Sequence, residues 1–189
     1  MWRSIEFKVF AVLMFAVGVW SDCHEADWSD SFNKFGLFEC DHIGDFLQGF
    51  CRTDPTQSNA KNGGLGKAVC CTKPPQWTGS ADFRLADWWS SFSTANASVE
   101  CPPGYFLTGL YKSEAGWKLS SIKEGRCTKA QDQPPRYEPC YDEDVSACFD
   151  KTGCCSCRKD TYITGLYRGE CNDLRCLTKL RCCAVLQAV

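Results

Sequence analysis

Histidine and methionine are scarce in this chain of 189 residues, which contains two of each. The two histidines, His24 and His42, are too few for a His-rich metal cage. They also argue against a nucleophile-based hydrolase, whose catalytic base is most often His. The G-x-S-x-G phrase of serine hydrolases is absent as well. We therefore expect a protein that is not an enzyme and that holds neither a metal nor a cofactor.

An excess of charge of one sign is also lacking. The chain has 21 Lys and Arg residues against 23 Asp and Glu residues, for a net charge of -2. A weakly acidic surface of mixed sign does not follow a phosphate backbone, so nucleic acid is not an expected partner. The lack of an acidic run argues in the same way against direct contact with a mineral.

The one long apolar run lies near the start of the chain. Residues 1–8 are polar with a net positive charge, Val9–Trp20 are apolar apart from Gly18, and Ser21 is a small residue suited to cleavage. This order is typical of a secretory signal peptide, here 1–21. Such a run is too short for a bilayer span, which takes about 20 residues. We expect the protein to be secreted and extracellular.

Cysteine, in contrast, is abundant, with 16 residues, all of them after the predicted leader. This density is typical of small secreted proteins that are held together by disulfides. The cluster Cys-Cys-Ser-Cys (154–157) and the four cysteines after it could instead be zinc ligands. In an exported chain we interpret them as disulfides.

Two kinds of phrase recur along the chain. D-W-S-D-S-F (27–32) returns as D-W-W-S-S-F (87–92), and F-L-Q-G-F-C-R (46–52) returns as F-L-T-G-L-Y-K (106–112) and Y-I-T-G-L-Y-R (162–168). Each copy closes on cysteine. Self-similarity of this kind indicates diverged repeats. We place three of them, at 22–75, 82–130 and 137–189.

The repeats restrict the disulfide pairing, which sequence alone usually leaves open. The middle repeat contains only Cys101 and Cys127, so a closed repeat requires that these two pair. An equal interval of 18 residues runs from Gly109 to Cys127 and from Gly165 to Cys183, which makes these cysteines equivalent. Cys51 and Cys70 of the first repeat are both replaced in the middle repeat, by Tyr111 and Arg126. Because they are absent together, we expect them to form a second bond with each other. The predicted pairs are Cys40–Cys71, Cys51–Cys70, Cys101–Cys127 and Cys157–Cys183, with Cys171 or Cys176 as the partner of Cys182.

Each repeat also predicts a strand. The phrase Y-F-L-T-G-L-Y (105–111) and its copies consist of aromatic, β-branched and long apolar residues around a central Gly. The Gly indicates a β-bulge or a close crossing of two backbones. No later segment keeps a helical period for three turns. The sequence therefore predicts an all-β, small disulfide-rich fold with three cysteine-stapled repeats and loop-rich modules.

Aromatic and basic side chains are the candidates for ligand contact, because an exposed tryptophan can stack on a sugar or lie at a membrane interface. Trp28 and Trp88 occupy matching repeat positions and are interpreted as core residues. A cation recurs three residues after each repeat Gly, where it could meet an anionic ligand or protect a strand edge. The sequon at 96–98 makes Asn96 the predicted glycosylation site. The ligand-contact candidates are Trp77, Trp89, Trp117, Arg52, Lys112 and Arg168.

The phrase C-P-P-G-Y-F-L-T-G-L-Y-K (101–112), its third copy and the closing cysteines resemble the cysteine-rich repeats of mollusc perforin-like (MACPF) proteins, including snail egg perivitellins. They are more loosely similar to the resistin-type β-modules of proprotein convertase tails. The resemblance covers about residues 27–183 and implies a trimodular β arrangement with a targeting or binding role. The repeats fill the predicted mature chain, so a pore-forming role is not expected.

These features predict a secreted, non-catalytic binding or structural protein of an invertebrate matrix, such as shell, skeleton or egg matrix. Its expected partner is an extracellular polysaccharide, a matrix protein or a glycan. The alternative is a secreted toxin or defence protein that contacts membranes or cell-surface glycans. A protease inhibitor would need a rigid exposed loop, for which 53–67 is the long candidate.

Overall fold

The computed structural model describes residues 22–29, 34–53, 64–74, 77, 79–116, 118–133 and 139–184. The predicted leader, Trp117 and most of the candidate inhibitor loop lie outside the described residues. The described chain is all-β, and its 16 cysteines form eight disulfides, which confirms the predicted fold class. Within these ranges, no helix has the length and apolar character of a membrane span.

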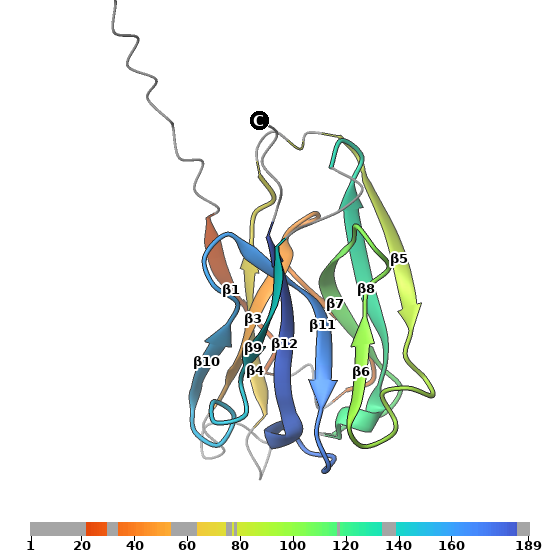
Figure 1. Cartoon of the computed structure of the whole chain (residues 1–189), viewed down its shortest axis with the longest axis vertical. Helices are drawn as coiled ribbons and strands as arrows, with labels where there is room; N and C mark the ends of the chain where they lie inside the picture. The colour runs from red at the N-terminus through yellow and green to blue at the C-terminus, as the bar shows by residue number, and fades with distance from the viewer. Residues whose placement is uncertain are drawn as a thin grey trace, which may run out of the picture.

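Each repeat contributes four strands in the same order, and most of them run roughly along the long axis of the molecule (Figure 1). The first repeat forms β1 (Cys23–Asp27), β2 (Gly36–Glu39), β3 (Phe46–Arg52) and β4 (Leu65–Cys71). The second forms β5 (Ala81–Asp87), β6 (Ala97–Glu100), β7 (Phe106–Lys112) and β8 (Ile122–Ala130). The third forms β9 (Cys140–Asp144), β10 (Gly153–Ser156), β11 (Thr161–Arg168) and β12 (Leu177–Ala184).

The three antiparallel sheets each combine strands from two repeats. Their orders are β1-β4-β3-β10, β2-β7-β8-β5 and β6-β11-β12-β9, which we call sheets A, B and C. Every repeat keeps three strands and gives its second strand to the sheet of the next: β2 joins sheet B, β6 joins sheet C, and β10 returns to sheet A. Figure 1 shows β6 beside β11. The exchange is cyclic, so the expectation that each repeat is a closed unit is wrong.

The recurring glycine allows the exchanged strand to approach. A Cβ atom at this position would lie 2.4 to 2.6 Å from a carbonyl oxygen of the incoming strand. This distance is too short for any residue with a side chain. The pairing of the same strand also shifts by one residue directly before the glycine. The sequence predicted a bulge or a close crossing, and the structure has both. The three glycines are Gly49, Gly109 and Gly165.

The core has two parts. On the pseudo-threefold axis, the rings of Phe46, Phe106 and Tyr162 meet with centroids 4.8 to 5.5 Å apart. The larger part contains Trp28 and Trp88, each 2% exposed, which confirms their predicted place in the core. Their Nε1 atoms donate to carbonyl oxygens of the exchanged strands β2 and β6, at 3.3 and 3.4 Å. The axial rings therefore pack the three repeats against one another, and the indole hydrogen bonds link each of the first two repeats to the strand that it gives to the next sheet.

The disulfides match one of the four predicted pairs. Cys101 bonds to Cys127 as predicted. The predictions Cys40–Cys71, Cys51–Cys70 and Cys157–Cys183 are wrong, and neither Cys171 nor Cys176 bonds to Cys182. The observed bonds are Cys40–Cys70, Cys51–Cys154, Cys157–Cys182, Cys171–Cys176, Cys23–Cys71, Cys140–Cys183 and Cys148–Cys155.

A one-residue error in register explains the wrong pairs. Cys127 lies opposite Leu107 in its sheet, and the equivalent cysteines of the other sheets are Cys70 and Cys182. Neighbouring strand residues point to opposite faces, so the next cysteines, Cys71 and Cys183, leave the larger part of the core and lie in the axial part. The equal interval of 18 residues arose because the connection before the last strand is one residue shorter in the third repeat. The Cys51 bond could not be foreseen because it joins two repeats.

Candidate functional site

The recurring cations donate hydrogen bonds to backbone carbonyls of the protein itself, with Lys112 and Arg168 buried and Arg52 half-buried. The Arg52 guanidinium donates to the Phe149 carbonyl oxygen, and Arg168 donates to the Phe92 carbonyl oxygen at 2.9 Å. The Lys112 ammonium is fully buried and donates to the Gly116 carbonyl oxygen. Burial lowers the pKa of Lys112 to about 8. These cations satisfy loop carbonyls, so their prediction as ligand contacts or edge protection is corrected.

The tryptophans predicted to lie on the surface differ in burial. Trp77 is only 4% exposed and packs on the axial rings of Phe46 and Phe106, so it is a core residue and the prediction for it is wrong. Trp89 is 50% exposed, and its ring lies 5.2 Å from the Lys123 ammonium. Trp117 lies outside the described residues. Of the six predicted contact residues, Trp89 is thus the one that the structure places on the surface.

The pseudo-symmetry makes the outer faces of the three sheets directly comparable. In sheets A and C a cross-strand disulfide, Cys23–Cys71 or Cys140–Cys183, occupies one position of this face. Sheet B has Phe83 opposite Thr128 at the same position. Two residues further along, Leu85 of sheet B corresponds to Glu25 in sheet A and Asp142 in sheet C. Sheet B is therefore apolar where the other two are covalently closed or charged.

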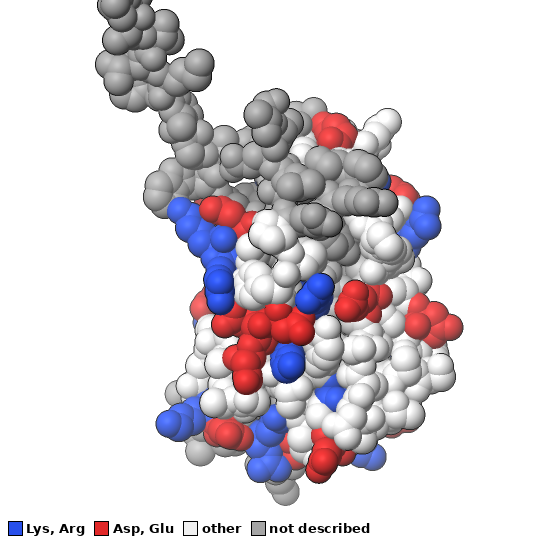
Figure 2. Space-filling view, in the orientation of Figure 1, with Lys and Arg blue, Asp and Glu red and all other residues white. Residues whose placement is uncertain are grey.

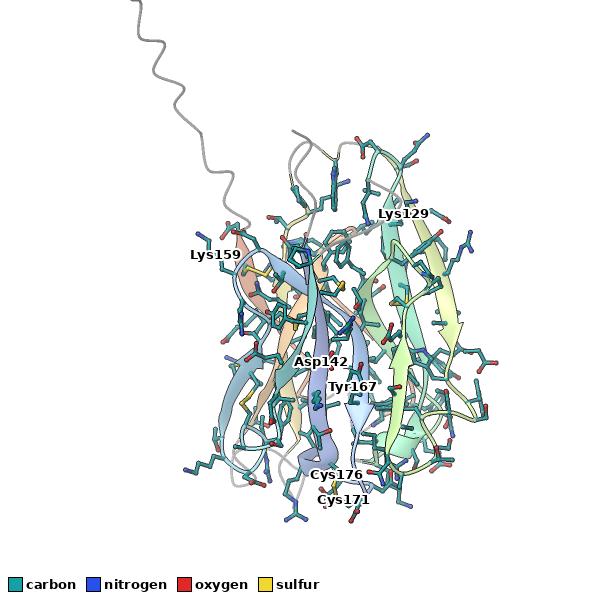
Figure 3. The ribbon with its side chains drawn as sticks, in the orientation of Figure 1. Lys129, Asp142, Lys159, Tyr167, Cys171 and Cys176 are labelled. Atoms are coloured by element: carbon teal, nitrogen blue, oxygen red, sulfur yellow. A yellow bond between two sulfur atoms is a disulfide. The ribbon has the colours of Figure 1, made fainter. Side chains whose placement is uncertain are left out.

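The outer face of sheet C is polar. Arg181 pairs with Asp142 at 2.9 Å across the strands, and the neighbouring residue Glu143 forms an ion pair with Arg158 at 3.6 Å. Figure 2 shows acidic and basic side chains side by side over β9 and β12. Asp142 and Tyr167 lie on this face, above Cys171 and Cys176 at the lower end of the molecule (Figure 3). These charges are largely paired with one another, so few of them are available to bind a charged ligand.

The outer face of sheet B and its rim hold all the exposed large hydrophobic side chains of the described residues. Monomeric proteins rarely gather such residues in one place without a binding role. The strands at both edges of the sheet contribute, since β2 and the segment before it lie on one side and β5 on the other. The exposed fractions are 73% for Phe35, 38% for Leu37, 97% for Ile43, 60% for Phe83, 55% for Leu85 and 50% for Trp89.

A pocket of about 320 Å³ opens between this face and the turn that follows Cys40. Phe83 and Ile43 form its apolar walls, while the carboxylates of Glu39 and Asp41 add polar groups. The Arg126 guanidinium pairs with Glu39 and lies 4.9 Å from the Phe83 ring centre. Thr108 and Thr128 line the floor and hydrogen-bond to each other at 2.9 Å. This volume lies at the lower end of the range for small-ligand pockets, about 300–1,000 Å³.

Sequence reasoning predicted no residue of this pocket as a ligand contact, and it named Cys40 only as a disulfide cysteine. Phe83 and Arg126 carry no motif, and only the register of the sheets places them beside the 40–45 turn. A signal was present, because Phe83 precedes the repeat tryptophan by the same five residues as Cys23. Comparison with protein-family models, curated proteins and solved structures finds no match to this chain.

Proposed function

We propose that the protein is a secreted, non-catalytic binding protein that takes an extracellular glycan or polysaccharide into the pocket on the outer face of sheet B. One observation carries the proposal: the pocket combines an aromatic wall, Phe83, with a fork of donors, Arg126, and three carboxylates. A sugar ring has an apolar C–H face and a rim of hydroxyl groups, so it suits such a mixed lining. Eight disulfides are typical of the extracellular setting that this role requires.

The repeats support a binding role in a second way. Sheets A and C keep the pocket position closed with a disulfide, and only sheet B replaces it with Phe83 and Thr128. A purely structural protein gains nothing by this loss, since a disulfide of this kind stabilises by about 2–4 kcal/mol. We propose the shell, skeleton or egg matrix of an invertebrate as the setting. Asn96, exposed in the turn before β6, is proposed as a glycan attachment site on the neighbouring sheet C.

A second candidate function rests on the exposed apolar residues themselves. Phe35, Leu85 and Trp89 extend the face beyond the pocket, and aromatic and aliphatic side chains of this kind insert into the interface of a lipid bilayer. A toxin or defence protein that recognises cell surfaces would use the whole face and not only the pocket. The two candidates differ in which residues matter.

We expect Phe83→Ser and Arg126→Gln each to weaken polysaccharide binding at least tenfold, which corresponds to about 1.4 kcal/mol. The mature protein would be incubated with chitin, calcium carbonate and liposomes, and its depletion from the supernatant measured. Arg181→Gln is the matched control, because Arg181 occupies the Arg126 position on sheet C and also forms an ion pair.

Equal loss of binding in the Arg181→Gln control would contradict the assignment to sheet B. Depletion by liposomes alone, abolished by Leu85→Asp, would replace the glycan proposal by the membrane one. Leu85→Asp introduces the residue type that sheet C has at this position, so it should be accepted by the fold.

A further inference from the structure

Three clusters of described residues could offer three ligand atoms to a metal ion. Two of them, Glu25 with Cys51 and Cys154, and Asp173 with Cys171 and Cys176, depend on sulfur atoms that are already joined in disulfides. A disulfide sulfur is not a thiolate and does not bind zinc. The third cluster consists of His24, His42 and Asp45. It unites both histidines of the chain with a buried carboxylate.

The fold brings these three side chains together from separate segments. His24 lies on β1, opposite Cys70, and Asp45 directly precedes β3. His42 lies in the turn before Asp45. A hydrogen bond of 3.2 Å from the Asp45 amide to the His42 carbonyl oxygen closes this turn. The turn needs Gly44, whose φ of +94° is rarely accessible to other residues. This connection is one residue longer than in the other repeats.

The distances within the cluster fit a transition metal. The Asp45 Oδ2 atom lies 3.4 Å from His42 Nδ1 and 3.7 Å from His24 Nδ1. Ligands of a tetrahedral zinc ion, with bonds of 2.0–2.1 Å, lie about 3.3–3.4 Å apart. The imidazole ring centres are 4.8 Å apart, so the rings flank the carboxylate without stacking. Small side-chain adjustments would complete three corners of a tetrahedron.

Two polar atoms of the cluster lack a hydrogen-bond partner. Asp45 is only 5% exposed, and its Oδ2 atom and the His24 Nε2 atom are both buried and unsatisfied. Burial of such atoms without a partner is unfavourable, and native proteins rarely leave them so. A cation held between Asp45 and the Nδ1 atoms of the two histidines would satisfy the carboxylate oxygen, and the His24 Nε2 atom would be left as it is. The arrangement is therefore more readily explained by a ligand set than by packing.

The second repeat has a contact at the same place that involves no metal-binding groups. Tyr105 precedes β7 as Asp45 precedes β3, and Arg84 has the strand position of His24. There the Arg84 guanidinium lies 5.1 Å from the Tyr105 ring centre, a cation–π contact between groups that do not bind metals. The combination of two imidazoles and a carboxylate is specific to the first repeat.

We propose that His24, His42 and Asp45 bind one borderline divalent transition-metal ion, with Zn²⁺ as the reference ion. Three protein ligands leave a fourth position open. His42 and Asp45 also line the pocket, so this position faces it. The proposal departs from the expectation that the protein holds no metal, and it does not depend on what the pocket binds.

Titration calorimetry of the chelator-treated protein with ZnCl₂ tests this site. We expect one equivalent of Zn²⁺, no binding of Mg²⁺, and at least a 100-fold loss of affinity in His42→Gln and in Asp45→Asn. His42→Gln should fold, because that side chain is 71% exposed. Asp160→Asn is the control for loss of a carboxylate beside a repeat strand, since Asp160 occupies the exposed turn position of Gly44 and Gly104, before β11.

Two further readouts separate a ligand set from a structural cluster. Zn²⁺ should raise the melting temperature of the wild type and not that of His42→Gln, and Co²⁺ should give the visible absorption of a tetrahedral site. Absence of Zn²⁺ binding by the folded wild type, or unchanged affinity in both His42→Gln and Asp45→Asn, would overturn the proposal.

Discussion

Replacing Cys51 and Cys154 together by alanine is expected to lower the free energy of unfolding by about 4 kcal/mol. This disulfide spans a sequence separation of 103 residues and joins the first repeat to the third. The other seven disulfides each lie within one repeat. Because the entropy of loop closure rises with loop length, this bond restricts the unfolded chain most. Its loss also removes the covalent link between the edge strand β10 and β3, which then depend on backbone pairing alone at this position.

The matched control is the double variant Cys171→Ala with Cys176→Ala, whose bond closes a separation of 5 residues and should contribute about 2 kcal/mol. Guanidinium unfolding would be followed by tryptophan fluorescence and by circular dichroism. We expect the two signals to coincide in both variants, since the exchanged strands couple the repeats. A smaller loss in the Cys51 variant than in the control, or separate transitions, would contradict cyclic coupling.

Phe106→Ala is expected to cost about 3–5 kcal/mol, the range for removing a buried aromatic ring. Phe106 is fully buried and contacts the rings of Phe46 and Tyr162, which belong to the other two repeats. The cavity therefore opens on the axis where all three sheets meet. Phe106→Leu, which keeps most of the volume, should cost less than about 1.5 kcal/mol.

Amide hydrogen exchange distinguishes an axial effect from a local one. If Phe106 supports the whole assembly, protection should fall to a similar extent in β3, β7 and β11. A loss confined to β7 and β8 would show that the repeats are stabilised separately and that the axial cluster does not couple them.

The sequence predicted the features that are encoded within a single repeat and recur from one repeat to the next. The strand phrases, the core places of Trp28 and Trp88 and the bulge at the repeat glycine each follow from local composition, and the structure confirms them. Exchange of the second strand could not be predicted, because each repeat contains all four strands that a closed sheet would need. The pairing of Cys51 with Cys154 was hidden for the same reason.

A third copy of the tryptophan phrase was overlooked because its tryptophan is replaced. Asp27, Asp87 and Asp144 each accept a hydrogen bond of 2.9 Å from the amide two residues further on. Val145 then takes the core position of the tryptophans and is 1% exposed. The common pattern is Asp at the start of the phrase and Phe five residues later, as in D-V-S-A-C-F (144–149). Recognition of this pattern would have aligned all three repeats from their first strands.

The candidate site was less predictable than the fold, because it arises from differences between repeats. Residue type predicts the opposite of what is observed for Phe83, which is exposed, and Lys112, which is buried, and only sheet register assigns one to the surface and the other to the interior. The two histidines illustrate the same point. Eighteen residues apart in the chain, they meet because β1 and the turn before β3 converge on Asp45.

Cyclic strand exchange is the feature on which the comparison of the three outer faces depends, and disulfide mapping tests it most directly. The unreduced protein would be digested at acidic pH, where thiolates that could exchange disulfides are scarce, and its linked peptides identified by mass spectrometry. We expect a peptide that joins Cys51 to Cys154, with Cys40 linked to Cys70. A peptide that joins Cys51 to Cys70 would instead show repeats closed on themselves and would contradict the exchange.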